Sequence, residues 1–241
     1  MSIIREEVTA ASKNELAAVA ASRLIDVLAP ATAERDAHVS LTGGSMGSAV
    51  LEVLAAHDRR RTVDWSRVHF WYSDERFTER DSDERNITPA RGLLAQLPAA
   101  VIHEPWGTED GSLDDAASAY AAELAEAAPE GQAAPAFDVV FLGVGPDAHV
   151  ASLFPGREEI LVSEATVLPI RNSPKPPPER VTFTLPIING ALRVWMVVAG
   201  ADKAEAVVRI RANAAPQEAP AAQVRGSIET VLFLDEAAAG I

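Results

Sequence analysis

Asp147 and His149 have the residue types and the spacing that suit acid–base chemistry best in this chain of 241 residues. They lie in a glycine-rich stretch, 143–156, directly after the nearly all-apolar run 137–142. An aspartate two residues away, or the loop backbone, can fix an imidazole so that one ring nitrogen accepts a proton. The pair therefore predicts a general base at His149. One histidine and one aspartate are too few ligands for zinc, so we expect no metal site.

Gly43, Gly44 and Ser45 form a second candidate segment, between a short apolar strand pattern and a helical pattern. The glycines allow a tight turn and close approach of a ligand, and the N–H groups at a helix start favour phosphate. Two other interpretations stay open: an ordinary strand-to-helix turn, and the G-x-S-x-G nucleophile elbow of the α/β-hydrolases, which this segment and Gly47 fit. The elbow is disfavoured because no histidine follows His149 to complete a late triad.

Asp74 and Arg76, with Glu75 between them, follow the predicted strand 67–72 and are a third candidate. Two acids and an arginine at a strand end could orient a polar substrate or stabilise a developing negative charge. The alternative is a surface loop of ion pairs. The neighbouring charged residues are expected to be solvated; these are Arg80, Asp81, Asp83, Glu84 and Arg85.

Lys175 and Arg180 are the fourth candidate, in and after the proline-rich stretch 174–178. Prolines lower the entropy that is lost when a loop holds a side chain in place. Arginine could bind a phosphate dianion through its fork, and lysine could bind it as a point charge. An exposed proline-rich loop is the other interpretation.

The elements that must position these residues alternate between helical and strand patterns along the whole chain. A capping box at Ser12 predicts a helix that ends at Pro30, and further helices are expected at 45–57, 86–97, 113–128 and 202–213. Strands are expected at 38–42, 67–72, 100–102, 137–142, 165–170, 180–185, 192–199 and 230–234. This alternation predicts a single α/β domain, 1–241, with a mostly parallel sheet and helices on both faces. Ligands bind such sheets at the carboxyl ends of the strands.

Composition excludes several classes of protein and site. The chain has no cysteine, which rules out disulfides, thiolate zinc sites and a cysteine nucleophile. Its net charge of −14 argues against nucleic acid or an anionic membrane as a partner. Ten acids and no base lie between residues 92 and 156, and we expect them to form a solvated helix face. No leader or membrane-spanning run is evident, so we expect a cytoplasmic protein.

The four candidate segments, in this order, resemble the 6-phosphogluconolactonases, a branch of a sugar-phosphate isomerase and deaminase superfamily. The resemblance covers roughly residues 39–211 and includes the segment 200–204, Gly-Ala-Asp-Lys-Ala. It implies a Rossmann-like, sugar-phosphate isomerase-like fold. It also implies hydrolysis of 6-phospho-D-glucono-1,5-lactone to 6-phospho-D-gluconate, in the oxidative pentose phosphate pathway, without a metal or organic cofactor.

The resemblance also implies a role for each candidate residue. His149 would be the general base for a water that attacks the lactone carbonyl, and Asp147 would hold the imidazole or bind sugar hydroxyls. Arg76 would stabilise the tetrahedral oxyanion. The remaining residues would bind substrate, chiefly its 6-phosphate; these are Gly43, Gly44, Ser45, Asp74, Lys175 and Arg180. The expected partner is the small-molecule lactone, with the protein a monomer or weak dimer.

Two departures from the family pattern and two rival functions stay open. The family commonly has Gly where this chain has Ala148, which would strain the backbone if a positive φ is needed, and Ser where it has Arg85. The rivals are a glucosamine-6-phosphate deaminase or isomerase and a non-catalytic sugar-phosphate sensor. The deaminases carry an acid soon after the histidine, whereas here no acid follows until Glu158.

Overall fold

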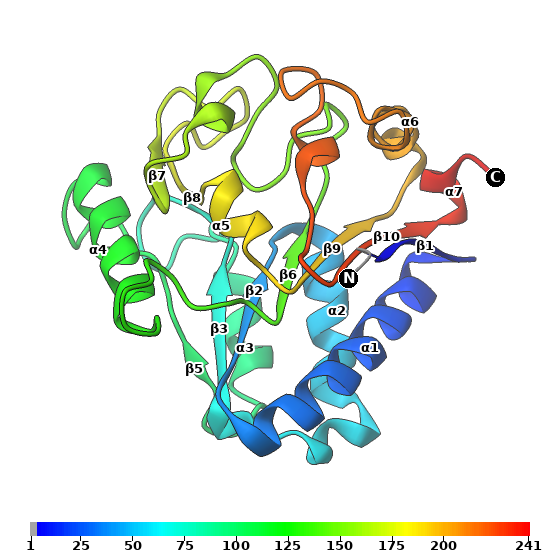
Figure 1. Ribbon diagram of the computed structural model, residues 1–241, viewed down its shortest axis with the longest axis horizontal. Coiled ribbons are helices and arrows are strands. Elements are labelled where there is room, and N and C mark those ends of the chain that lie inside the picture. The colour runs from blue at the N-terminus through cyan, green and yellow to red at the C-terminus, as the bar shows by residue number, and fades with distance from the viewer. Residues whose placement is uncertain (1–3) are drawn as a thin grey trace.

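A parallel sheet of seven strands forms the centre of the protein, for which a computed structural model describes residues 4–241 (Figure 1). The strand order is β1-β10-β9-β6-β2-β3-β5, and every pairing is parallel. The strands are β1 (Ile4–Ala10), β2 (Ala37–Leu41), β3 (Val68–Tyr72), β5 (Val101–Ile102), β6 (Val139–Leu142), β9 (Arg193–Val198) and β10 (Glu229–Asp235). The predicted α/β fold with a mostly parallel sheet is confirmed.

Helices cover both faces of this sheet because alternate strand residues point to opposite sides. One buried cluster joins the sheet to α1 (Lys13–Glu34), α2 (Gly44–Ala56) and α3 (Arg91–Leu94). The other joins it to α4 (Leu113–Glu126), α5 (Leu185–Asn189), α6 (Ala204–Arg211) and α7 (Glu236–Ala239). The buried clusters leave the carboxyl ends of the strands to the connecting loops.

A second sheet of three antiparallel strands lies among those loops and was not predicted as a separate layer. Its order is β4 (Asp74–Arg76), β8 (Arg180–Phe183) and β7 (Val167–Ile170). The register places Arg76 directly opposite Arg180. This register therefore concentrates positive charge next to the ends of the main sheet, although like charges at opposed positions repel each other.

Two predicted helices have the wrong bounds and one strand was not predicted, each for an identifiable reason. Helix α1 continues through Pro30 to Glu34, because its buried face extends to Thr32. The helix expected at 86–97 is reduced to a 3₁₀ turn, Thr88–Ala90, and the short α3, because the N–H groups of residues 86 and 87 bind the Glu75 carboxylate. Strand β1 was missed because acidic residues hide its pattern, which an edge strand tolerates.

The acidic stretch 92–156 is only partly a solvated face, which corrects that expectation. Several of its acids pair with arginines from elsewhere in the chain, and Asp138 is buried on Arg35 at 2.5 Å. The exposed or half-buried pairs are Glu104–Arg91, Asp110–Arg80 and Asp114–Arg171. These contacts place much of the excess charge in local ion pairs.

Helix α1 is the one helix among residues 4–241 that is long and apolar enough to span a membrane by length and composition. Its buried residues pack against the sheet within the first core cluster. Core helices pass the same composition test, so this is weak evidence for a membrane span.

Candidate active site

A cavity of about 290 Å³ opens at the carboxyl ends of β2 and β6 and beside β4. Its walls bring together most of the predicted site residues, namely Gly43, Gly44, Asp74, Arg76, His149, Lys175 and Arg180. Asp147 contacts two of these residues, His149 and Lys175. Ser45 instead lines a neighbouring cleft of about 320 Å³, which shares Gly44 and Arg76 with the cavity.

The imidazole of His149 is held by Asp147, as the spacing predicts. Nδ1 of the ring lies 2.5 Å from Oδ1 of Asp147. Because a carboxylate only accepts hydrogen bonds, we assign the proton to Nδ1, which leaves the lone pair on Nε2. No hydrogen bond to Nε2 is found within residues 4–241, and the ring borders the cavity. The geometry suits a general base that works through Nε2.

The loop 143–156, here named the histidine loop, presents this pair on a tight hairpin. Ala148 N–H donates to the Gly145 carbonyl, and Gly145 N–H donates to the His149 carbonyl. Such three-residue hairpin loops place their last residue in the left-handed region. Ala148 has φ of +66°, so the strain that its departure from glycine implied is present. Gly145 is needed for space, because a Cβ there would lie 2.1 Å from the imidazole.

Lys175, which was expected to bind phosphate, lies next to the Asp147–His149 pair. Its Nζ donates a hydrogen bond to Asp147 Oδ1 at 3.1 Å. It also lies 3.1 Å from His149 Nδ1, which carries the proton assigned above and so accepts no hydrogen bond from it. Partial burial disfavours the Asp147 carboxylate, but the contacts with His149 and Lys175 outweigh that effect and hold the pKa of Asp147 well below its ordinary value. Asp147 therefore remains ionised at neutral pH.

Arg180, which was expected to bind phosphate, borders the cavity and also fastens the proline-rich loop. Nη2 donates to the carbonyls of Lys175 and Pro176, and Nε donates to that of Pro177, at 3.0–3.1 Å. The residue is 3% exposed. Burial lowers its pKa and the facing charge of Arg76 adds to that effect, whereas Asp74 opposes it. Arg180 thus holds Lys175 in place and adds positive potential at the cavity wall.

Asp74 is also engaged within the protein. Its Oδ2 accepts a hydrogen bond from Ser152 Oγ at 2.7 Å and lies 3.7 Å from Arg180 Nη1. This contact joins the second sheet to the histidine loop. Asp74 borders the cavity, but its carboxylate is mostly buried.

The N-terminus of α2 faces the same cavity. Gly43 is its N-cap, without a side-chain cap, and Gly44 has φ of +75°. Asn86 fills the space where a Cβ of Gly43 would lie. Helix starts with uncapped N–H groups bind anions, and α2 adds a favourable dipole.

Lys203 and Asn86 also line the cavity, and neither was assigned a role from the sequence. Lys203 lies in the segment 200–204, which follows β9, the strand next to β6 in the sheet. A lysine at a strand end beside the predicted site was a signal that could have identified it. Arg85 was expected to be solvated, and that expectation was wrong, since its side chain is fully buried.

Comparisons with known proteins agree with this fold. Residues 11–233 match the family described as Glucosamine-6-phosphate isomerases/6-phosphogluconolactonase. The 6-phosphogluconolactonase of Streptomyces coelicolor is 45% identical over 239 residues, covering 94% of this chain and 90% of that protein. That of Mycobacterium tuberculosis is 41% identical over 232 residues, covering 93% of each.

A solved structure gives the same result at the level of the fold. The structure of 6-phosphogluconolactonase from Trypanosoma brucei superposes with a TM-score of 0.85 and 26% identity, covering 99% of both chains. The chain therefore has the α/β fold of that sugar-phosphate enzyme. It belongs to the glucosamine-6-phosphate isomerase/6-phosphogluconolactonase family, and the family predicted from its motifs is confirmed.

Proposed function

We propose that this protein hydrolyses 6-phospho-D-glucono-1,5-lactone to 6-phospho-D-gluconate, a step of the oxidative pentose phosphate pathway. The observation that carries the proposal is the 2.5 Å contact between Asp147 and His149, which leaves Nε2 toward a cavity lined by cations. The names of relatives at 41–45% identity support the same reaction.

In the proposed mechanism, His149 Nε2 takes a proton from a water whose oxygen attacks the lactone carbonyl carbon. The carbonyl π electrons move to oxygen, and Arg76 stabilises the resulting oxyanion. The oxyanion collapses and breaks the ring C–O bond, and His149 returns its proton to the departing ring oxygen. The new carboxylic acid then loses its proton to water. Asp147 stabilises the imidazolium throughout, as the third member of a triad does. These steps need no metal or organic cofactor.

The 6-phosphate binds at the other end of the cavity, against Gly43 and Gly44 at the start of α2. Backbone N–H groups and the helix dipole favour the phosphate there, and Lys203 supplies a full positive charge. Lys175 stays with the reacting end because it contacts the catalytic pair. This assignment revises the expected phosphate contacts of Lys175 and Arg180.

We further propose a cytoplasmic enzyme that acts as a monomer or weak dimer on a small-molecule substrate. The net charge of −14 supports the absence of nucleic acid or anionic membranes as partners. The arginines and lysines of the cavity supply local positive charge for an anionic substrate.

The test is a coupled lactonase assay with the lactone made in situ and the spontaneous hydrolysis rate subtracted. Enzymatic opening of the lactone well above that rate is expected. Ammonia release from glucosamine 6-phosphate, without lactone hydrolysis, would assign the protein to the deaminases of the family. Binding of 6-phosphogluconate without turnover of either substrate would identify a sensor.

A further inference from the structure

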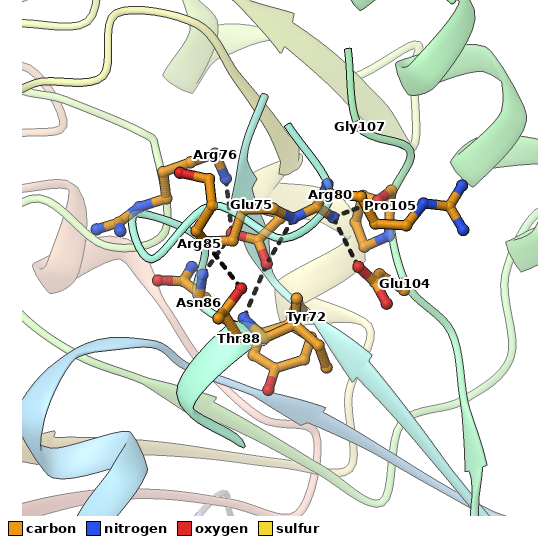
Figure 2. Close-up of polar contacts among 12 residues, drawn as sticks. Tyr72, Glu75, Arg76, Arg80, Arg85, Asn86, Thr88, Glu104, Pro105 and Gly107 are labelled. Carbon is orange, nitrogen blue, oxygen red and sulfur yellow. Dashed lines mark hydrogen bonds and ion pairs between the residues drawn. The ribbon is translucent and has the colours of Figure 1, made fainter. Parts of the chain in front are cut away.

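Glu75 fastens both ends of the loop 76–87, here named the arginine loop, with a single carboxylate (Figure 2). Its Oε1 accepts hydrogen bonds from the backbone N–H groups of Arg76 at 2.8 Å and Asn86 at 2.7 Å. Its Oε2 accepts one from the N–H of Ile87 at 3.0 Å. Both oxygens of the carboxylate are therefore needed to close the loop.

Arg85 supplies the positive charge that such a buried carboxylate requires. Its Nε lies 3.8 Å from Glu75 Oε2, and both side chains are almost completely buried. Its Nη2 donates to the Pro105 carbonyl and lies 3.3 Å from Glu104 (Figure 2). Arg85 thus also ties the arginine loop to the segment that follows β5.

Two residues of this arrangement reach the active cavity, whereas Glu75 itself does not border it. Arg76 begins the arginine loop, and its Nη1 donates to the Glu84 carbonyl within the same loop. Its buried Nε has no hydrogen-bond partner in the part of the chain that the structure describes, residues 4–241. The direction of the Arg76 side chain therefore depends on the shape of the loop. Asn86, the second residue, donates to the Asp74 carbonyl and packs against Gly43.

We propose that Glu75 is a positioning residue for the lactone hydrolysis proposed above, and that it acts by holding Arg76 at the oxyanion. The inference rests on that proposed function. Burial raises the pKa of Glu75 to about 7, even though Arg85 and three N–H groups favour its ionised form. Above that pH the fold keeps an ionised side chain that burial disfavours, and the hydrogen bonds of this side chain shape one wall of the active cavity.

The experiment is a double-mutant cycle on kcat at pH 8, with Glu75→Gln, Arg76→Ala and the pair. In Glu75→Gln an amide nitrogen replaces one oxygen and cannot accept the Ile87 N–H, so the loop loosens. We expect kcat to fall about tenfold or more while KM changes by less than about threefold, since a displaced oxyanion donor affects the transition state most. In the Arg76→Ala background, Glu75→Gln should cause no further loss, because Glu75 acts through Arg76.

Glu104→Gln is the matched control, because Glu104 contacts the same Arg85 from outside the arginine loop. Its kcat should stay within about twofold of the unmodified protein. If Glu75→Gln is not folded by circular dichroism, Glu75→Asp carries the same cycle, because it keeps the charge opposite Arg85 but shortens the reach to the backbone.

Three results would overturn the inference. They are an unchanged kcat in the Glu75 variant, losses that multiply in the double variant, or an equal loss in Glu104→Gln. Each is distinct from failure of the proposed function, in which the unmodified protein itself would not hydrolyse the lactone. Full activity of Arg76→Ala alone would remove the oxyanion role of Arg76 and, with it, this role for Glu75.

Discussion

The histidine loop and the arginine loop form two walls of one cavity but are held by different forces. The histidine loop buries apolar side chains along its length, including Val144, Val150, Leu153 and Phe154. The arginine loop has few apolar residues and is closed by the buried contacts of Glu75 and Arg85. Apolar burial holds this loop and leaves the side chains of Asp147 and His149 36% and 15% exposed. The arginine loop positions Arg76, which takes no part in proton transfer. The buried pair of Glu75 and Arg85 can therefore hold this loop.

The largest expected effect is on catalysis by the histidine loop. His149→Gln removes the base and should lower kcat about 10²–10⁴-fold, the usual contribution of general-base catalysis. The affinity for 6-phosphogluconate, measured by calorimetry, should be nearly unchanged because the phosphate end of the cavity is intact. A variant with full kcat would show that another group acts as the base.

The two loops should differ next in the pH dependence of stability. The pKa of Glu75 is raised from 4.5 to about 7, so the folded chain binds this proton more tightly than the unfolded chain. Proton binding by Glu75 therefore stabilises the fold fully below pH 4.5, and this stabilisation is lost as the pH rises through about 7. The difference in unfolding free energy between the unmodified protein and Glu75→Gln should shift by about 3 kcal/mol over that range.

Asp147→Asn is the control for this measurement, in urea titrations at pH 4.5 and pH 7.5. The pKa of Asp147 is lowered, so its stabilising contribution is lost only as the pH falls below the ordinary value of 3.8. Measured in the His149→Gln background, which removes the imidazole that Asp147 contacts, the effect of Asp147→Asn should be flat between the two pH values. A flat difference for Glu75→Gln as well would contradict the raised pKa and the contrast between the loops.

Arg85→Met should separate stability from activity in the two loops. The loss of the hydrogen bond to the Pro105 carbonyl and of the positive charge next to buried Glu75 should together cost about 3 kcal/mol of unfolding free energy. Asp147→Asn, at a side chain that is 36% exposed, should cost less than about 1 kcal/mol but lower kcat. Chemical denaturation of both variants at one pH gives the comparison. Equal stability losses would mean that both loops are held in the same way.

The smallest effect is expected at Ala148→Gly in the histidine loop. Glycine relieves the positive φ of +66°, but the exchange removes a buried methyl group and increases the freedom of the unfolded chain. The opposing terms should leave the melting temperature and kcat nearly unchanged, with less than about 1 kcal/mol in stability. A large gain in kcat would show that the alanine distorts the catalytic pair.

The same contrast explains how much the sequence could predict. His149, Asp147 and the glycines lie in short contiguous segments at strand ends, so spacing and strand order were enough to bring them to one cavity. Arg85 lies among exposed charged residues, and nothing local distinguishes it from them. Its burial depends on Glu75 and on the segment after β5, and such contacts between distant segments leave no periodic pattern. The antiparallel second sheet escaped prediction for the same reason, since β4 and β8 lie about a hundred residues apart.

The central claim places the reacting carbonyl at His149 and Arg76 and the phosphate at Gly44 and Lys203. A crystal structure of the protein with 6-phosphogluconate tests this orientation most directly. The account predicts the product carboxylate within hydrogen-bond distance of Arg76 and beside His149 Nε2, and the phosphate at the N-terminus of α2 with Lys203. A phosphate bound to His149 and Lys175, with the carboxylate at α2, would contradict it.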